Sequence, residues 1–153
     1  MISGRPSSRR LVMGLPERAL GEVLQPASVS VSIEPQGDYP IAGIYSFGRG
    51  LIRRPAVRGS ETSCATLSRL RAGQLTMSKL NAWEGALAVI PGEFEGSYVS
   101  PEYPIFEIDR DQAGPAYIAH LVTWPGLWDR LTPKGSMVRR KGTNHTIQHR
   151  VAI

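Results

Sequence analysis

Arginine dominates the basic side chains of this 153-residue sequence, and arginine has a specific recognition chemistry. The chain has 18 Lys and Arg residues against 13 Asp and Glu, a formal net charge of +5, and its lysines are only Lys79, Lys134 and Lys141. A planar guanidinium forms two hydrogen bonds at once to a phosphate, or to O6 and N7 of guanine, whereas lysine offers a point charge. The composition favours contact with a polyanion, although many basic proteins never bind nucleic acid.

Several arginines stand beside glycine-containing turns, where the backbone can approach a ligand closely. One group surrounds Gly48-Arg49-Gly50, and another follows Lys134-Gly135-Ser136, whose hydroxyl and amides suit a phosphate. The candidate contacts from these turns are Arg49, Arg53, Arg54, Ser136, Arg139 and Arg140. The alternative for each arginine is a solvated or salt-bridged side chain.

Charge is arranged in blocks along the chain. Residues 45–79 contain seven basic residues and one acid, Glu61; residues 84–129 contain eight acids and one base, Arg110; residues 130–153 contain six basic residues and no acid. If folding brings the two basic blocks together, the protein presents one positive surface with an acidic rear. The alternative is a set of solvated faces that cancel in three dimensions.

Catalytic patterns are weak by comparison. A metal-dependent nuclease needs converging carboxylates, and the candidates are Glu95, Glu102, Glu107 and Asp109. Glu107 and Asp109 alternate onto one strand face, but this stretch contains no lysine. His145 and His149 have a spacing that fits a metal on a helix, yet their Thr and Asn neighbours favour an extended segment. The sequence predicts no catalytic centre, no metal and no cofactor, because it contains no phosphate loop, nucleophile elbow or S-adenosylmethionine motif.

Length and composition favour a single cytoplasmic domain. The chain can bury one sizeable core, and residues 1–15 are expected to form a flexible lead-in to a domain over 16–153. The longest clear apolar run, residues 86–90, is far too short for a membrane span. Cys64 is alone, so no internal disulfide is possible and a reducing compartment is the expected setting.

The predicted elements describe an α+β fold that is strand-rich first and helical near the C-terminus. Alternating Val29, Val31 and Ile33 predict a half-buried strand. Further strands are expected at residues 39–45, 67–70, 75–80, 86–90, 97–100 and 105–108. Pro115 suits a first helical position, with His120 on the side of that helix. A second short helix is expected after Pro125, before Pro133.

Residues 73–109 (GQLTMSKLNAWEGALAVIPGEFEGSYVSPEYPIFEID) carry the most specific pattern. Its parts are Ser78-Lys79, Asn81-Ala82-Trp83-Glu84-Gly85, Val89-Ile90-Pro91, Glu95-Gly96, Val99-Ser100 and Phe106-Glu107-Ile108-Asp109. Their order resembles the signature of the DNA specificity (S) subunits of type I restriction–modification systems. Other matching parts are Leu20-Gly21-Glu22-Val23-Leu24, Ala42-Gly43-Ile44-Tyr45, Gly48-Arg49-Gly50, Tyr117-Ile118, Trp128-Asp129-Arg130-Leu131 and Gly135-Ser136. Each part alone is weak, but together they cover roughly residues 18–140.

The resemblance implies a non-catalytic target-recognition domain that reads one half of a bipartite site in double-stranded DNA. In this family, methyltransferase and restriction subunits perform the chemistry, and a long helix after each recognition domain acts as spacer and docking surface. No such helix is expected here, so the domain is interpreted as truncated before it, and docking to a methyltransferase is in doubt. The alternative is a free-standing or decayed DNA-binding fragment.

Within the signature, most residues are expected to be scaffold, because a motif shared by readers of many sequences cannot choose bases. Gly43 and Gly85, with Gly48 and Gly50, are expected to provide positive φ or close backbone approach. Pro91 is expected to form a turn with Gly92.

For the polar residues and the tryptophan of the motif, two interpretations stay open. Lys79 can neutralise a phosphate, and Asn81 can pair with adenine or serve as a turn residue. Trp83 is a DNA contact or a core or hinge aromatic, and Glu84 takes part in recognition or orients Lys79 or an arginine. On this basis we expect Arg53→Ala and Arg139→Ala to weaken DNA binding and to lower its salt dependence.

Overall fold

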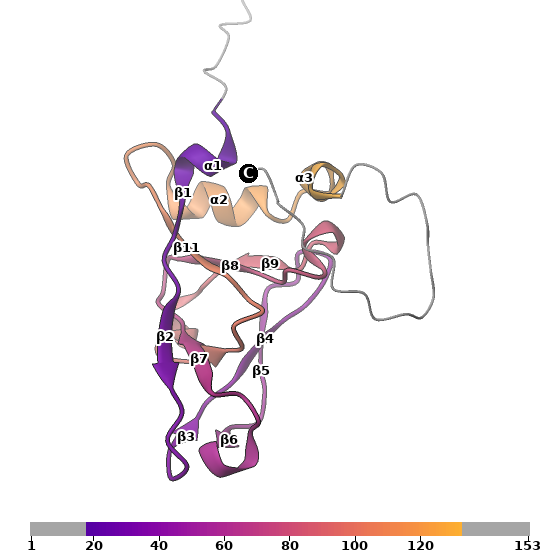
Figure 1. The fold of residues 1–153 in the computed structure, drawn as a ribbon. Helices are drawn as coiled ribbons and strands as arrows, with labels where there is room; N and C mark the ends of the chain where they lie inside the picture. Colours follow the sequence, from indigo (N-terminus) through magenta and orange to yellow (C-terminus); the bar gives the residue numbers. More distant parts are fainter. Residues whose placement is uncertain (1–17, 133–153) are drawn as a thin grey trace, which may run out of the picture.

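The computed structural model describes residues 18–132, and these form short strands followed by two short helices (Figure 1). The helices are α1 (Leu20–Val23), α2 (Pro115–Leu121) and α3 (Pro125–Leu131). The strands are β1 (Leu24–Pro26), β2 (Val29–Ser32), β3 (Asp38–Tyr39), β4 (Ala42–Ile44), β5 (Leu51–Arg53), β6 (Val57–Arg58), β7 (Thr66–Arg69), β8 (Leu75–Met77), β9 (Leu87–Val89), β10 (Tyr98–Val99) and β11 (Ile105–Ile108). Three single-turn 3-10 helices cover Gly59–Glu61, Ala82–Glu84 and Gly92–Phe94.

Two antiparallel sheets organise the strands. The larger has the order β1-β11-β8-β9, with Leu24 opposite Ile108 and Leu75 opposite Val89. The second has the order β10-β7-β2, with the β2 residue Val31 opposite Leu67. Because strands distant in sequence lie side by side, neither sheet forms from local hairpins alone.

Two clusters of buried side chains make up the core. The first packs the larger sheet against α1, α2 and α3, which lie together on one side of it in Figure 1. Its members are Val23, Leu24, Leu75, Met77, Leu87, Ile108, Ile118, Val122 and Leu127. The second cluster contains Ala42, Leu70, Ile90, Phe94, Val99 and Ile105, with Leu51 packed against it. The second cluster therefore supports the strands β4 and β5.

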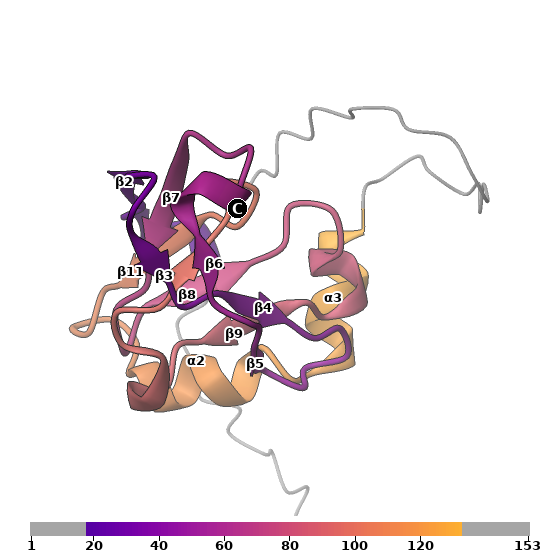
Figure 2. The ribbon, with the colours of Figure 1, turned by 90° about the horizontal axis from the view of Figure 1, so that it is seen from below.

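β4 and β5 form a separate two-stranded antiparallel ribbon, which Figure 2 shows running toward α3. Gly43 is opposite Ile52, and Ala42 is opposite Arg53. Alternate residues of a strand face opposite sides, so Ala42, Leu51 and Arg53 face the second cluster. Gly43, Ile52 and the following Arg54 share the other side, which we call the outer face of the ribbon.

The α+β fold class is confirmed, with the single-turn helix α1 before the strands and the helices α2 and α3 after them. The helix starting at Pro115, with Gly114 as its N-cap, is confirmed, and so is the second helix at Pro125. The strand expected at residues 39–45 is interrupted, because Pro40 separates β3 from β4.

One burial expectation was wrong. β2 forms where Val29 and Val31 predicted a strand, but Val29 is 51% exposed and the strand is not half-buried. β2 lies at the edge of its sheet, so one of its long sides has no neighbouring strand.

Candidate nucleic-acid interface

The outer face of the ribbon carries an exposed arginine laid across a glycine. A Cβ added at Gly43 would lie 3.0 Å from Nε of Arg54 and 3.2 Å from Cγ2 of Ile52. The missing side chain of Gly43 is thus what allows the Arg54 side chain to cross the ribbon. The guanidinium of Arg54 forms no hydrogen bond or ion pair with residues 18–132, so it is available for a ligand.

The turn between β4 and β5 presents a second arginine together with aromatic side chains. The guanidinium carbon of Arg49 lies 4.5 Å from the ring centroid of Tyr45, and its Nε donates to the carbonyl of Ser46 at 3.1 Å. Tyr45 N donates to the carbonyl of Gly50 at 2.9 Å, which closes the turn. Stacking on a ring and one hydrogen bond restrict the Arg49 side chain while leaving it exposed.

Arg53 points to the inner side of the ribbon. Its Nη2 donates to the carbonyl of Glu93 at 2.6 Å, and its guanidinium carbon lies 5.0 Å from the ring centroid of Phe94. These contacts attach the ribbon to the 3-10 helix Gly92–Phe94. A role of Arg53 in DNA binding stays a prediction. In the structure, its guanidinium binds a backbone carbonyl of the protein itself.

The Ser78–Gly85 segment is a compact turn built from backbone hydrogen bonds. The carbonyl of Asn81 accepts from the amides of Glu84 (3.0 Å) and Ala86 (3.1 Å), and the Asn81 amide donates to Oγ of Ser78 at 3.2 Å. Asn81 therefore acts as a turn residue through its backbone, and its exposed side chain remains a candidate base contact. Lys79 is also exposed, with its amide donating to the carbonyl of Glu102 at 3.3 Å.

Trp83 lies at the surface of this turn rather than in the core. Its side chain is 45% exposed, and its Nε1 donates to the carbonyl of Leu80 at 2.9 Å. The core interpretation of Trp83 was wrong, although its indole N–H has the expected partner. Trp83 and Leu80 together give the turn an exposed apolar side.

The Ser78–Gly85 turn, which we call the motif turn, is hydrogen-bonded to the turn between β4 and β5, which we call the ribbon turn. Trp128 of α3 packs against both turns. The amides of Phe47 and Gly48 donate to the carbonyls of Glu84 (2.7 Å) and Gly85 (2.9 Å). A Cβ at Gly85 would lie 2.5 Å from the Trp128 ring, and one at Gly48 would lie 3.1 Å from it. The indole Nε1 of Trp128 donates to the carbonyl of Val122 at 2.8 Å, which fixes the ring.

The expected glycine conformations agree with these contacts. Gly48, Gly50 and Gly85 have φ values of +65°, +81° and +79°, and Gly43 provides close approach instead. Pro91 caps the 3-10 helix Gly92–Phe94, with its carbonyl accepting from the Phe94 amide at 3.0 Å. These motif residues are scaffold in the structure.

Glu84 does not orient Lys79, and this expectation was wrong for that pair. The single ion pair among residues 18–132 joins Arg58 to Asp38, with an N–O distance of 3.8 Å. Glu84 contributes through its backbone carbonyl, which accepts from Phe47. The 3-10 helix directs this carbonyl toward the turn between β4 and β5. Because the contact uses the backbone, it does not require the charge of the Glu84 carboxylate.

Acids and bases also mix more than the charge blocks predicted. Arg69, Arg71 and Glu95 line one pocket with Val29, and Arg53 contacts Glu93. Oε2 of Glu95 accepts a hydrogen bond from the amide of Ala72. At this pocket, then, the acid Glu95 lies beside two arginines of the first basic block. The second block lies almost entirely outside the described residues.

Sequence reasoning missed Phe47, Tyr45, Arg69 and Arg71 as surface contributors. Phe47 is 64% exposed and has a φ of +64°, which is rare for a residue with a bulky side chain. The signal was its place between Ser46 and Gly48 in a glycine-rich turn, where apolar residues are unexpected. Arg69 and Arg71 belong to the basic block, and Arg71 directly precedes the Ala72-Gly73-Gln74 connector, which is the signal that could have identified it.

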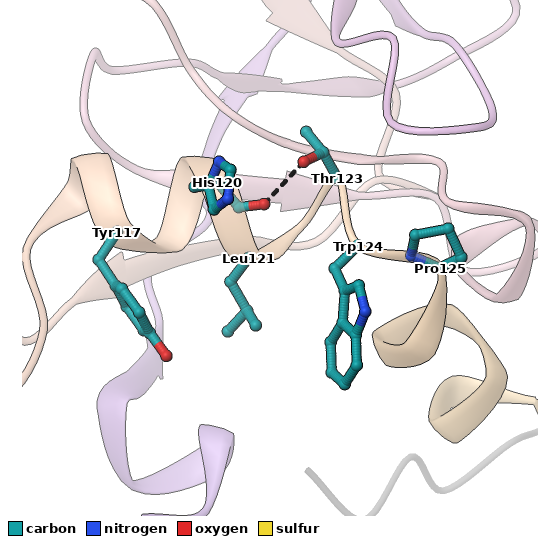
Figure 3. A pocket seen from close by; sticks show the side chains of 6 residues that line it. All are labelled: Tyr117, His120, Leu121, Thr123, Trp124 and Pro125. Atoms are coloured by element: carbon teal, nitrogen blue, oxygen red, sulfur yellow. Dashed lines mark hydrogen bonds between the residues drawn. The ribbon is translucent and has the colours of Figure 1, made fainter.

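A pocket of about 380 Å³ lies at the junction of α2 and α3 (Figure 3). It is lined by Tyr117, His120, Leu121, Thr123, Trp124 and Pro125. The Thr123 hydroxyl donates to the backbone carbonyl of His120 at 2.7 Å. The polar side chains that line it among residues 18–132 are those of Tyr117, His120 and Thr123.

The carboxylates of two acidic candidates, Glu107 and Asp109, are bonded to glutamine side chains. Oε2 of Glu107 accepts from Nε2 of Gln74 at 2.9 Å, and Oδ2 of Asp109 accepts from Nε2 of Gln112 at 2.7 Å. Glu102 lies in the loop before β11, with its amide donating to Oγ of Ser100 at 3.3 Å. Among residues 18–132, no three His, Cys, Asp or Glu side chains are placed to hold a metal ion together. None of the helices in this range is long and apolar enough to span a membrane.

Several predicted contacts lie outside the described residues. These are Ser136, Arg139, Arg140, His145 and His149, together with the lead-in over residues 1–15.

Comparison with known proteins identifies the fold. A solved structure that matches is the crystal structure of the HsdS subunit from Thermoanaerobacter tengcongensis, with a TM-score of 0.61 and 20% sequence identity. The match covers 83% of this chain and 33% of that chain, so the present chain corresponds to about a third of the HsdS subunit. No protein-family model and no curated protein sequence matches the chain. The structure therefore has the fold of part of an HsdS subunit.

Proposed function

We propose that this chain is a target-recognition domain of the type I restriction–modification specificity class, which binds double-stranded DNA and reads one half of a bipartite target. The observation that carries the proposal is the outer face of the β4–β5 ribbon, where Arg54 is exposed and Arg49 is stacked on Tyr45. The HsdS-like fold supports the same assignment. The domain extends over residues 16–153 in this proposal.

A two-stranded ribbon suits this role because the major groove of B-form DNA admits one. The inner face of the ribbon is packed on Phe94 and its neighbours, which makes the ribbon rigid. Its outer face is free to meet base edges through Arg54 or to bind phosphates. Lys79 and Asn81 extend the contact from the motif turn, and Ser136, Arg139 and Arg140 do so from the C-terminal segment.

The domain has no catalytic role in this proposal. A methyltransferase subunit and a restriction subunit perform the reactions, and the domain selects the DNA on which they act, in the cytoplasm. The carboxylates of Glu107 and Asp109 are each bonded to a glutamine side chain, which is compatible with this binding role.

The salt dependence of DNA binding tests the proposal on matched arginines. We expect Arg54→Ala to weaken binding to duplex DNA and to reduce the slope of log K against log salt by about one, the loss of one phosphate contact. The control is Arg58→Ala, which removes another exposed arginine. Arg58 is paired with Asp38 of β3 and bonded to Gln36 in the turn before β3, away from α3 (Figure 1). Fluorescence anisotropy at several salt concentrations measures both.

Equal slopes for the wild type, Arg54→Ala and Arg58→Ala would count against the ribbon as the DNA contact. Absence of any salt-dependent binding by the wild type would reject the proposed function itself.

A further inference from the structure

The tip of the ribbon exposes an aromatic ring in an unfavourable backbone conformation. Phe47 is 64% exposed, and its φ of +64° lies in the left-handed region that glycine occupies easily and phenylalanine does not. Neither burial of the ring nor backbone preference explains a phenylalanine here. An observed backbone outlier at an exposed position is a reason to look for a binding role.

The structure holds Phe47 rigidly in this conformation. Its amide donates to the carbonyl of Glu84 at 2.7 Å, and the next amide, of Gly48, donates to the carbonyl of Gly85 at 2.9 Å. The ring lies edge-to-face to Trp128, with centroids 6.4 Å apart. One edge of the ring is thus supported, while most of it faces solvent.

Cationic and apolar side chains surround this ring. Arg49, two residues further, is stacked on Tyr45 and bonded to Ser46. The neighbouring motif turn contributes the exposed Leu80 and Trp83, with Lys79 before them and the half-buried acid Glu84 after them. An apolar tip with cations beside it complements a stack of bases between phosphates better than it complements an apolar protein surface.

We propose that the Phe47 ring is a wedge that stacks against a base of bound duplex DNA and partly unstacks one base step. This inference rests on the proposed DNA binding of the ribbon. The Phe47 contact differs from the proposed arginine contacts, because the stacking of a ring on a base does not depend on the phosphate charge. Because the turn already fixes the backbone of Phe47, little conformational entropy is lost at this residue when DNA binds.

Replacing Phe47 with glycine is a clean test because glycine accepts the observed φ, so the variant keeps the turn while losing the ring. Phe47→Tyr keeps a ring. Tyr117→Ala is the matched control, since it removes another exposed aromatic, on α2 beside the pocket in Figure 3. Circular dichroism and thermal unfolding of all four proteins verify that they are folded.

The probe is a duplex enriched by the wild-type protein from a pool with a randomised centre, labelled with 2-aminopurine at one position at a time. We expect the wild type to raise 2-aminopurine fluorescence at one or two adjacent positions, as a base loses its stacked neighbour. Phe47→Gly abolishes this rise and weakens binding about 10- to 100-fold, with the salt slope unchanged. Phe47→Tyr and Tyr117→Ala retain the rise.

Two other outcomes overturn the inference, and they are distinguishable. If the wild type binds DNA and Phe47→Gly binds it equally well, the wedge is wrong while the proposed function stands. If the wild type neither enriches nor binds any duplex, the proposed function fails and the wedge fails with it.

Discussion

At the scale of single residues, two glycines with nearly the same backbone conformation differ in their surroundings. Gly85 and Gly50 have φ values of +79° and +81°. A Cβ at Gly85 would lie 2.5 Å from the Trp128 ring, whereas a Cβ at Gly50 would meet nothing within 4 Å. The pair separates the effect of backbone strain from the effect of packing.

We expect Gly85→Ala to lower the free energy of unfolding by more than about 3 kcal/mol, because left-handed strain and overlap with Trp128 add together. Gly50→Ala carries the strain alone and should cost about 1–2 kcal/mol. Urea denaturation of the two variants measures the difference. Equal losses at the two positions would mean that the indole of Trp128 does not pack against Gly85.

Residue types predicted the glycines that shape the turns better than the directions in which the arginine side chains point. Glycine adopts positive φ more easily than any other residue, so Gly85 at the end of the Asn81–Gly85 motif was expected to need its conformation. The inward direction of Arg53 and the outward direction of Arg54 follow from strand pairing between Ala42–Ile44 and Leu51–Arg53. The sequence did not predict β5, because two apolar residues give too short a pattern.

At the scale of elements, α3 connects two turns that are distant in the sequence. Trp128 packs against Gly85 and Gly48, and its Nε1 is bonded to the carbonyl of Val122 at the end of α2. The sequence predicted a short helix after Pro125 from the spacing of Leu127, Trp128 and Leu131, but it did not predict the contact of this helix with the motif turn. That contact joins residues more than forty positions apart, which no local pattern encodes.

We expect Trp128→Phe to lower the free energy of unfolding by about 1–3 kcal/mol, through the lost hydrogen bond and the reduced ring. Hydrogen exchange should accelerate about tenfold more at the Phe47 and Gly48 amides than at Ile90, whose amide donates to Gln74 in the core. Trp124→Phe is the control, because that ring is exposed and its indole forms no hydrogen bond with residues 18–132. Uniform acceleration at all three amides in Trp128→Phe would show that Trp128 supports the fold as a whole and not the two turns.

At the scale of the whole molecule, the described residues divide into two packed regions. Helices α1, α2 and α3 pack with the larger sheet around the first core, and the β4–β5 ribbon packs on the second core through Ala42 and Leu51. The order of motifs along the sequence was enough to predict the fold class and the resemblance to specificity subunits. The order of strands within each sheet was not predictable, because it depends on long-range pairings such as β1 with β11.

The most direct test of the central claim is whether this chain prefers one DNA sequence over others. Duplexes enriched from a randomised pool are compared with mixed-sequence duplex in competition binding at physiological salt. We expect one short sequence to be enriched and to bind at least about 10³-fold more tightly than mixed-sequence DNA. Equal affinity for enriched and mixed-sequence duplexes would contradict a sequence-reading role for this domain.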